Sequence, residues 1–455
     1  MFWCLIYNVS SNSFIKTPLR EKTRGVILCK ELEKIVSITN IISAIGNNNS
    51  IYPLLIRDCG IENVAKVTMT YNQNAKDSKF IAKQATRERI VDEYGTSAVW
   101  LGGIPVMNFV SDKVIKLFGL SPDVNIKLLN ETKAQGLNKN IEKFKKLAPK
   151  EVNELINIKN NKKIFQNAQI FKLLATTLIP ICIMGYLLPK ANYKYTEKKL
   201  TQQRNREKSI NTLEIKSKTF QAFKGNLENK TKENISFKSI ANLTNLSTLQ
   251  KMMILDGGLT LGRIQTSRNK NEKAEMAFKM AGMCYLNYVA PKKIESILNK
   301  ATKIVFGINT ELDPKILNNK KFIEKIKTNS LVLPKVLTEE GLIDYIDTQK
   351  NSIFTKFAKE LKIVKFLDNN IRDPRKFVET KKLEILANNL KEFSQNALKS
   401  KNFESYVKKA KYSKCFNIIT NVIVSSALLA IALPKAQFIF RKILTGQNTE
   451  PGIKI

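Results

Sequence analysis

Residues Cys415–Pro434 read CFNIITNVIVSSALLAIALP, a run of 20 residues without a charged side chain. A helix of about 20 apolar residues is long enough to cross the hydrocarbon core of a bilayer, which is about 30 Å thick. Small and β-branched residues suit packing between membrane helices, and Asn417 and Asn421 lie one helical turn apart, where they can hydrogen-bond a neighbouring helix. The sequence therefore predicts a hydrophobic membrane helix at about 415–434.

A second apolar run, LLATTLIPICIMGYLLP at Leu173–Pro189, is uncharged for 17 residues and lies near the lower limit for a span. Pro180 in its middle predicts a kink, which membrane helices tolerate when neighbouring groups satisfy the freed carbonyl. The two runs together predict a helical membrane protein. The alternative is that both are buried core helices of a large soluble protein.

Two further apolar runs are shorter or interrupted. The run YGTSAVWLGGIPVMNFVS at Tyr94–Ser111 contains Gly102, Gly103 and Pro105, which predict a broken or re-entrant element. The run MAGMCYLNYVAP at Met280–Pro291 has only 12 residues and is too short to cross a bilayer. The sequence leaves open whether these two runs cross, re-enter or pack as core.

Two pairs of segments indicate an internal duplication. The segment LPKANYKYTEKKLTQQ at Leu188–Gln203 matches LPKAQFIFRKILTGQ at Leu433–Gln447 with one gap. Upstream, FGLSPDVNIKLLN at Phe118–Asn130 aligns without gaps on FGINTELDPKILN at Phe306–Asn318. Because both matches occur in the same order with similar neighbours, the sequence predicts two tandem repeat units.

We therefore expect a mainly α-helical membrane protein. Each repeat unit would hold a Gly/Pro-broken apolar element, a basic helical stretch and a hydrophobic helix ending in LPKA. Strand patterns are sparse, and the apolar spacing within 320–410 is typical of amphipathic helices. The predicted organisation is an N-terminal segment (1–59), repeat unit 1 (60–205, hydrophobic helix about 173–189), a polar basic linker (206–254), repeat unit 2 (255–447, hydrophobic helix about 415–434) and a tail (448–455).

Four residues are predicted to break helices. Gly119 and Gly307 each follow a helical stretch and are expected at a C-terminal left-handed position, which glycine adopts at little cost. Pro189 and Pro434 end the two long apolar runs, where a helix is expected to stop.

Aromatic and basic residues directly follow both prolines and predict membrane-interface anchors. Aromatic rings are enriched at headgroup level, and lysines near helix ends reach toward lipid phosphates. The predicted anchors are Tyr193, Tyr195, Phe438, Phe440, Lys190 and Lys435.

The chain is strongly basic, with 76 Lys and Arg residues against 39 Asp and Glu residues and a formal net charge of +37. Such a charge predicts attraction to anionic lipid headgroups. Nucleic acid is a less favoured partner, because Arg, the better reader of phosphate and guanine, is scarce. The abundance of Lys, Asn and Ile is also typical of an AT-rich genome. Both apolar runs have basic residues on each side, so the positive-inside rule gives no orientation.

No catalytic, cofactor-binding or metal-binding residue is predicted. The chain contains no His, which excludes Ser-His-Asp catalysis and His-ligated metals, and its six Cys residues form no CxxC pair. The segment Met252–Arg268 departs from a phosphate-binding loop at Arg263 and Ile264 and is interpreted as a glycine-rich turn. The segment TRERIVDEYG at Thr86–Gly95 is interpreted as a salt-bridged, solvent-facing helix.

The favoured hypothesis is a non-enzymatic, membrane-anchored interaction or scaffold protein in the cell membrane of an AT-rich bacterium. Its Lys-rich surfaces would face anionic lipid headgroups, and it would bind a protein partner or itself. One alternative is a soluble or peripheral nucleic-acid-binding protein. The other is a repeat-built transporter or pore, which requires a polar cavity between the repeats. Neither long apolar run contains a carboxylate or Arg for such a path.

Overall fold

The computed structural model describes residue 42 and residues 54–130, 134–211, 248–368 and 370–453. This part of the chain is mainly α-helical and contains no β-strand, as the sequence predicts. The predicted N-terminal segment (1–59) and the middle of the predicted linker (212–247) lie almost entirely outside it. The ends of that linker are helical, because one helix continues to Asn211 and the next begins at Thr248.

The part of the chain predicted as repeat unit 1, called unit 1 below, lies in three long helical rods of a bundle. The first rod joins η1 (Leu54–Glu62) to α5 (Asn63–Asn74). The second joins α6 (Lys79–Ala98), η2 (Val99–Gly103) and α7 (Ile104–Leu117). The third joins α11 (Lys162–Cys182), η3 (Ile183–Leu187) and α12 (Leu188–Asn211). The three η segments are π-helical turns within otherwise α-helical rods.

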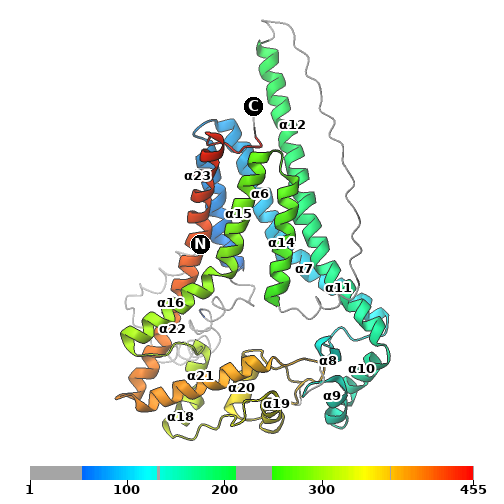
Figure 1. Ribbon diagram of the computed structural model, residues 1–455, viewed down its shortest axis with the longest axis vertical. Coiled ribbons are helices and arrows are strands. Elements are labelled where there is room, and N and C mark those ends of the chain that lie inside the picture. Colours follow the sequence, from blue (N-terminus) through cyan, green and yellow to red (C-terminus); the bar gives the residue numbers. More distant parts are fainter. Residues whose placement is uncertain (1–41, 43–53, 131–133, 212–247, 369, 454–455) are drawn as a thin grey trace, which may run out of the picture.

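The part predicted as repeat unit 2, called unit 2 below, also lies in three rods. These are α14 (Thr248–Thr266), α15 (Lys270–Tyr288) followed by α16 (Ala290–Phe306), and α22 (Phe403–Ala427) continuing through η4 (Leu428–Ala432) into α23 (Leu433–Thr445). Figure 1 shows α11–α12 and α22–α23 rising in the same direction, while α6–α7 and α15–α16 descend. The predicted starts of the units, at 60 and 255, fall inside η1 and α14.

The two LPKA sequences occupy the same place in their rods. Leu188 begins an α-helix directly after the π-helical segment η3, and Leu433 does so directly after η4. Pro189 and Pro434 therefore do not end their helices. Each lies in the first turn of the helix that follows, where a proline without an N–H is tolerated.

Three of the four apolar runs meet one another and helix α14 in one layer of the bundle. Met184, Leu255, Leu259 and Met280 form a buried cluster, and partly buried Trp100 packs on it. The run at Tyr94–Ser111 is helical through the π-helical turn η2, and the run at Met280–Pro291 joins α15 to α16. The segment Met252–Arg268, interpreted above as a turn, lies almost wholly in helix α14, so that interpretation is wrong.

A smaller head domain lies at the lower end of the bundle (Figure 1). In each unit, it connects the second rod to the third. Its elements are α8 (Lys127–Asn130), α9 (Leu137–Phe144), α10 (Pro149–Asn160), α17 (Pro314–Leu317), α18 (Lys320–Lys327), α19 (Glu339–Thr348), α20 (Ile353–Glu360) and α21 (Thr380–Lys399). The main core contains Phe322, Phe354, Phe357 and Phe393.

Segments of the two units hold the head domain together. Gln135 from unit 1 donates its side-chain amide to the carbonyl of Val378 at 2.9 Å and accepts from its N–H at 2.7 Å. Arg375 pairs with Glu154 at 3.1 Å. The head therefore contains parts of both units.

Two helical rods are long and apolar enough to cross a membrane, Lys162–Arg206 and Phe403–Thr445. Only 22% and 33% of their most apolar windows are buried by the described chain. A core helix of a soluble protein is mostly covered by other parts of the protein, and these two rods are not. Their outer faces leave large apolar side chains exposed, among them Leu178, Leu187, Phe416, Ile423 and Ile431.

Candidate functional site

The two units meet above the apolar layer, where each LPKA leucine packs on a glycine. Leu188 covers Gly95 on α6 so closely that a Cβ there would lie 2.9 Å from a leucine methyl group. Leu433 covers Gly282 on α15 in the same way. Glycine at these positions lets the rods approach, because any larger side chain would displace the leucine.

The same spacing places a buried glutamate near each LPKA helix. Glu88 and Glu275 both lie seven residues before those glycines. Asn192, four residues after Leu188, donates to the backbone carbonyl of Glu88 at 2.9 Å. Gln437, four residues after Leu433, donates to the side chain of Glu275 at 2.6 Å. In both units, an amide four residues after the leucine thus contacts the glutamate, through its backbone carbonyl in unit 1 and its carboxylate in unit 2.

Each of these glutamates binds an arginine, fully buried in one case and partly buried in the other. Arg441 on α23 binds Glu275 through two nitrogens, the shorter distance being 2.6 Å, and its side chain is fully buried. Arg268 binds both oxygens of Glu88, at 3.1 and 3.2 Å, and also pairs with Glu272. Bidentate pairing satisfies the charges that burial would otherwise make costly.

A second group of charges lies nearer the apolar layer. Glu93 on α6 accepts from Lys279 at 3.1 Å and from Arg89 at 3.2 Å, and Lys66 on α5 lies 3.5 Å away. Asp92 beside it pairs with Arg263 of α14 at 2.6 Å. These pairs connect α5, α6, α14 and α15, so ion pairs hold the units to each other.

Burial raises the pKa of Glu88 to about 7, although Arg268 acts in the opposite direction. The nearby carboxylate of Glu450 adds to the rise. The side chain is only 5% exposed, and its removal from bulk solvent disfavours the charged form. Glu88 is therefore a group that changes its charge near neutral pH.

A cavity of about 50 Å³ lies among these residues. That volume is enough for a few water molecules. Its lining comes from α6, α12, α15, α23 and the segment after α23, and it consists of Glu88, Arg89, Asp92, Pro189, Asn192, Tyr193, Glu272, Glu275, Met276, Gln437, Glu450 and Pro451. The interface between the units is thus polar and charged. Within the described residues, no group of three or more Cys, Asp or Glu side chains is arranged to hold a metal ion.

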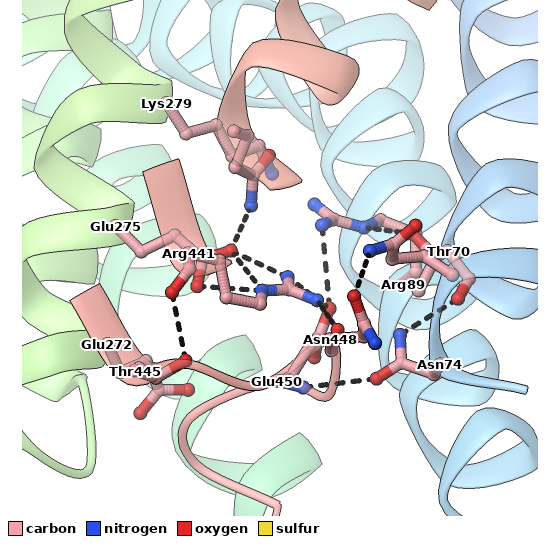
Figure 2. Close-up of polar contacts among 12 residues, drawn as sticks. Thr70, Asn74, Arg89, Glu272, Glu275, Lys279, Arg441, Thr445, Asn448 and Glu450 are labelled. Atoms are coloured by element: carbon pink, nitrogen blue, oxygen red, sulfur yellow. Dashed lines mark hydrogen bonds and ion pairs between the residues drawn. The ribbon is translucent and has the colours of Figure 1, made fainter. Parts of the chain in front are cut away.

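The segment 447–453 covers one side of this cavity (Figure 2). The backbone N–H of Glu450 donates to Asn74 at 3.0 Å, and Asn269 donates to the carbonyl of Pro451 at 2.6 Å. Ile453 is buried in an apolar cluster with Ile81 of α6. The carboxylate of Glu450 lies 3.6 Å from the guanidinium groups of Arg89 and Arg441, each of which has a closer carboxylate partner.

Several predicted membrane anchors point toward the protein interior. Tyr193 lines the cavity, with the Arg268 guanidinium carbon 4.2 Å from its ring centre, and Phe438 is buried beside Arg441. These two aromatic residues are therefore not interface anchors, because they pack within the unit interface. Phe440 stacks on Phe278 at 4.6 Å. Tyr195, Lys190 and Lys435 are exposed on the outer surface.

The two predicted helix-breaking glycines lie at matching ends. Gly119 follows α7 with φ of +70°, and Gly307 follows α16 with φ of +64°. Their backbone N–H groups bond the carbonyls of Lys116 and Lys303 respectively, which ends each helix.

Sequence reasoning missed the charged interface. The segment Thr86–Gly95 was expected to face solvent, but Glu88 and Glu93 are buried, so that interpretation is wrong. One signal was available. In both units a charged helical segment directly precedes an interrupted apolar run, Tyr94–Ser111 in one and Met280–Pro291 in the other.

The chain matches no protein-family model, no curated protein and no solved structure.

Proposed function

We propose that this protein is an integral membrane protein that anchors a basic head domain at a membrane surface. It acts as a non-enzymatic interaction or scaffold protein, and anionic lipid headgroups contact the Lys-rich surface. Two parallel three-rod units form the membrane part. A bacterial cell membrane remains the predicted location.

The observation that carries this proposal is the apolar outer surface of the bundle. Both candidate spans leave most of their apolar windows uncovered by the described chain. Neighbouring rods add exposed apolar side chains, including Phe109 on α7 and Leu261 on α14. An apolar surface of this extent is rare on a monomer in water and is expected in contact with lipid.

The matched contacts of the two units support an origin by duplication. Leu188 on Gly95 corresponds to Leu433 on Gly282, and the π-helical turns η3 and η4 precede the two leucines. The rods of both units run in the same order and direction (Figure 1). Units of this kind are related by an axis along the bundle, which is one of the two repeat arrangements found in membrane proteins.

Membrane fractionation tests the proposal. We expect the full chain to stay in the membrane pellet after washing with alkaline carbonate or with high salt. Detergent is expected to release it, because burial of the apolar rods in lipid does not depend on ionic strength. Release by salt alone would contradict the proposal and favour the nucleic-acid or peripheral alternative.

A second candidate function is solute passage between the units, as in a repeat-built transporter or pore. The cavity favours it, because ionisable residues between membrane helices are costly and often mark a path for ions or solutes. Segment 447–453 would have to move for a solute to enter. The carboxylate of its Glu450 lies 3.6 Å from two arginines that have other partners, and the backbone N–H of Glu450 bonds Asn74 at 3.0 Å.

Cysteine accessibility tests this second candidate. In a variant without native cysteines, Met276→Cys places a thiol in the cavity lining. Ala85→Cys with Ile453→Cys then joins segment 447–453 to α6, within one apolar cluster. We expect oxidation of that pair to slow labelling of Cys at 276 by a water-soluble reagent at least tenfold, and reduction to restore it. Equal rates with and without the bond would contradict passage through this opening. Lys198→Cys, exposed on α12, is the control.

A further inference from the structure

The ends of α7 and α16 carry the most exposed apolar side chains at the lower end of the bundle. Leu117 and Phe118 are 85% and 65% exposed, and Val305 and Phe306 are 69% and 64% exposed. Single exposed apolar side chains are common on protein surfaces. Pairs of neighbouring exposed apolar residues at equivalent positions of two units are not. We call Leu117–Phe118 and Val305–Phe306 the two apolar tips.

The two tips have the same local construction. Each is followed by a left-handed glycine, Gly119 or Gly307, which turns the chain out of its rod. The next residue is buried in a head-domain core, Leu120 in one unit and Ile308 in the other. The turn therefore leaves the tip outside while the chain enters the head, so exposure of the tip follows from the backbone path.

The tips also lie just beyond the lower boundary of the apolar layer. Lys172 directly precedes one long apolar run and pairs with Asp112 of α7, and Lys414 directly precedes the other and pairs with Glu295 of α16. From Asp112 to Phe118 the chain advances six residues, about 9 Å along a helix, and from Glu295 to Phe306 it advances eleven residues, about 16 Å along a helix. Helix α16 runs obliquely to the bundle in Figure 1, so its descent below Glu295 is smaller than its length. The headgroup region of a bilayer extends about 5–8 Å beyond the hydrocarbon.

Lysines flank both tips. Lys113 and Lys116 are exposed on the last turns of α7, and Lys300 and Lys303 are exposed on α16. Aromatic and aliphatic side chains beside lysines are the composition that binds at headgroup level, where rings enter the outer acyl region and ammonium groups meet phosphates. In Figure 1, α7 and α16 descend to opposite sides of the bundle, above the head domain.

We propose that the two apolar tips insert into the headgroup region of the leaflet next to the head domain, and that they fix the depth and tilt of the bundle. The occupant of both tips is lipid, with phosphates at the flanking lysines. This inference depends on the proposed membrane location. It replaces the anchors predicted at Tyr193 and Phe438, which face the interior.

Tryptophan fluorescence in liposomes tests the proposal on the full-length protein. Trp3 and Trp100, the two native tryptophans, are first changed to Phe, and Phe118→Trp and Phe306→Trp are then made singly. Quenching is measured with lipids brominated near the headgroup, with lipids brominated deep in the acyl chain, and with aqueous iodide. We expect both tips to be quenched at least twofold more by the shallow bromines than by the deep ones.

Two reference variants make the outcomes distinct. Ile423→Trp lies on the exposed face of α22 within the long apolar run and should be quenched by deep bromines. Val332→Trp lies on the exposed surface of the head domain and should be quenched by iodide alone. If both tips behave like position 332 while position 423 is quenched by lipid, the inference is wrong and the membrane location stands. If position 423 is also insensitive to lipid, the membrane location itself is wrong.

A protein partner gives a different pattern. If the tips are shielded from iodide and from both brominated lipids, protein covers them, either a partner or a second copy, and the lipid assignment is overturned.

Discussion

Among single residues, Arg441 and Glu275 form a buried ion pair that joins α23 to α15. Both side chains are at most 6% exposed, and the shortest nitrogen–oxygen distance is 2.6 Å. Removal of one partner leaves a buried charge without compensation, which costs about 3–5 kcal/mol. We expect Arg441→Met to lower the free energy of unfolding by that amount, measured by denaturation in detergent.

Two controls accompany this prediction. Lys327→Met breaks a pair with Glu404 whose side chains are 62% and 79% exposed, and it should change stability by less than about 1 kcal/mol. Changing both Arg441 and Glu275 to Leu should recover most of the loss, because no unpaired charge remains. A single variant as stable as the parent would show that this pair does not hold α15 to α23.

Glu88 gives the interface a dependence on pH. Its pKa is raised from 4.5 to about 7 in the folded protein, chiefly by burial. The folded carboxyl group therefore binds its proton more tightly than the unfolded one, so stability is highest below about pH 4.5 and falls as the pH rises through about 7. We expect Glu88→Gln to remove a fall of about 3 kcal/mol between pH 5 and pH 8. Unfolding curves at the two pH values measure this difference.

Glu379 in the head domain is the control for that measurement. A hydrogen bond from Lys382 is the main cause that holds the pKa of Glu379 below its usual value. The stabilising contribution of Glu379 is complete when the pH is above that usual pKa, and it is lost only when the pH falls below it. Glu379→Gln should therefore not alter the change in stability between pH 5 and pH 8. If Glu88→Gln also leaves it unchanged, Glu88 is not the titrating group.

Among the helical elements, the contact of α14 with η3 depends on two facing glycines. A Cβ added at Gly262 would lie 2.9 Å from the backbone oxygen of Gly185, and backbone cannot move aside as a side chain can. We expect Gly262→Ala to cost about 1–3 kcal/mol of stability. Thermal unfolding in detergent compares it with the parent protein.

Gly257, on the same helix, provides the matched control. A Cβ there meets no atom within 4 Å. Gly257→Ala should therefore raise stability by about 0.5–1 kcal/mol, because alanine loses less backbone entropy in a helix. Equal effects of the two substitutions would mean that α14 and η3 are not in close contact.

The helices themselves could be predicted from the sequence, but their pairing could not. Apolar spacing and the glycines at 119 and 307 are local signals, and they give the helical class and two helix ends. The partners of Glu88 and Glu93 are Arg268 and Lys279, about 180 residues further along the chain. Because those partners could not be identified from the sequence, the charged residues of Thr86–Gly95 were predicted to face solvent.

The glycines of Met252–Arg268 misled the prediction for a related reason. Glycine disfavours an isolated helix, so a turn was expected there. In the folded chain, Gly258 and Gly262 lie against Ile181 and Gly185, so close packing with η3 and the end of α11 compensates for the weak helix propensity. The π-helical turns before Leu188 and Leu433 could not be predicted, because no single residue in the sequence indicates such a turn.

In the whole molecule, charge and apolar surface are separated. The buried interface pairs its acids and bases, so the net charge of +37 is carried mainly by the surface. Along both long rods, the apolar run lies between the head-domain end and the residues of that interface. A layer of apolar surface between two polar regions is the distribution that a bilayer requires.

Two lysine substitutions at equally exposed positions distinguish lipid from water around this layer. Ile423 on α22 is 61% exposed, and Val332 in the head domain is 63% exposed. In water, both changes would be tolerated. In lipid, a lysine in the middle of a span costs about 2.5–3.5 kcal/mol of insertion free energy. We therefore expect Ile423→Lys to lower the membrane-inserted fraction severalfold, measured by resistance to carbonate extraction, and Val332→Lys to leave it unchanged. If both variants insert and fold alike, water surrounds the face of α22 and the rods are not membrane spans.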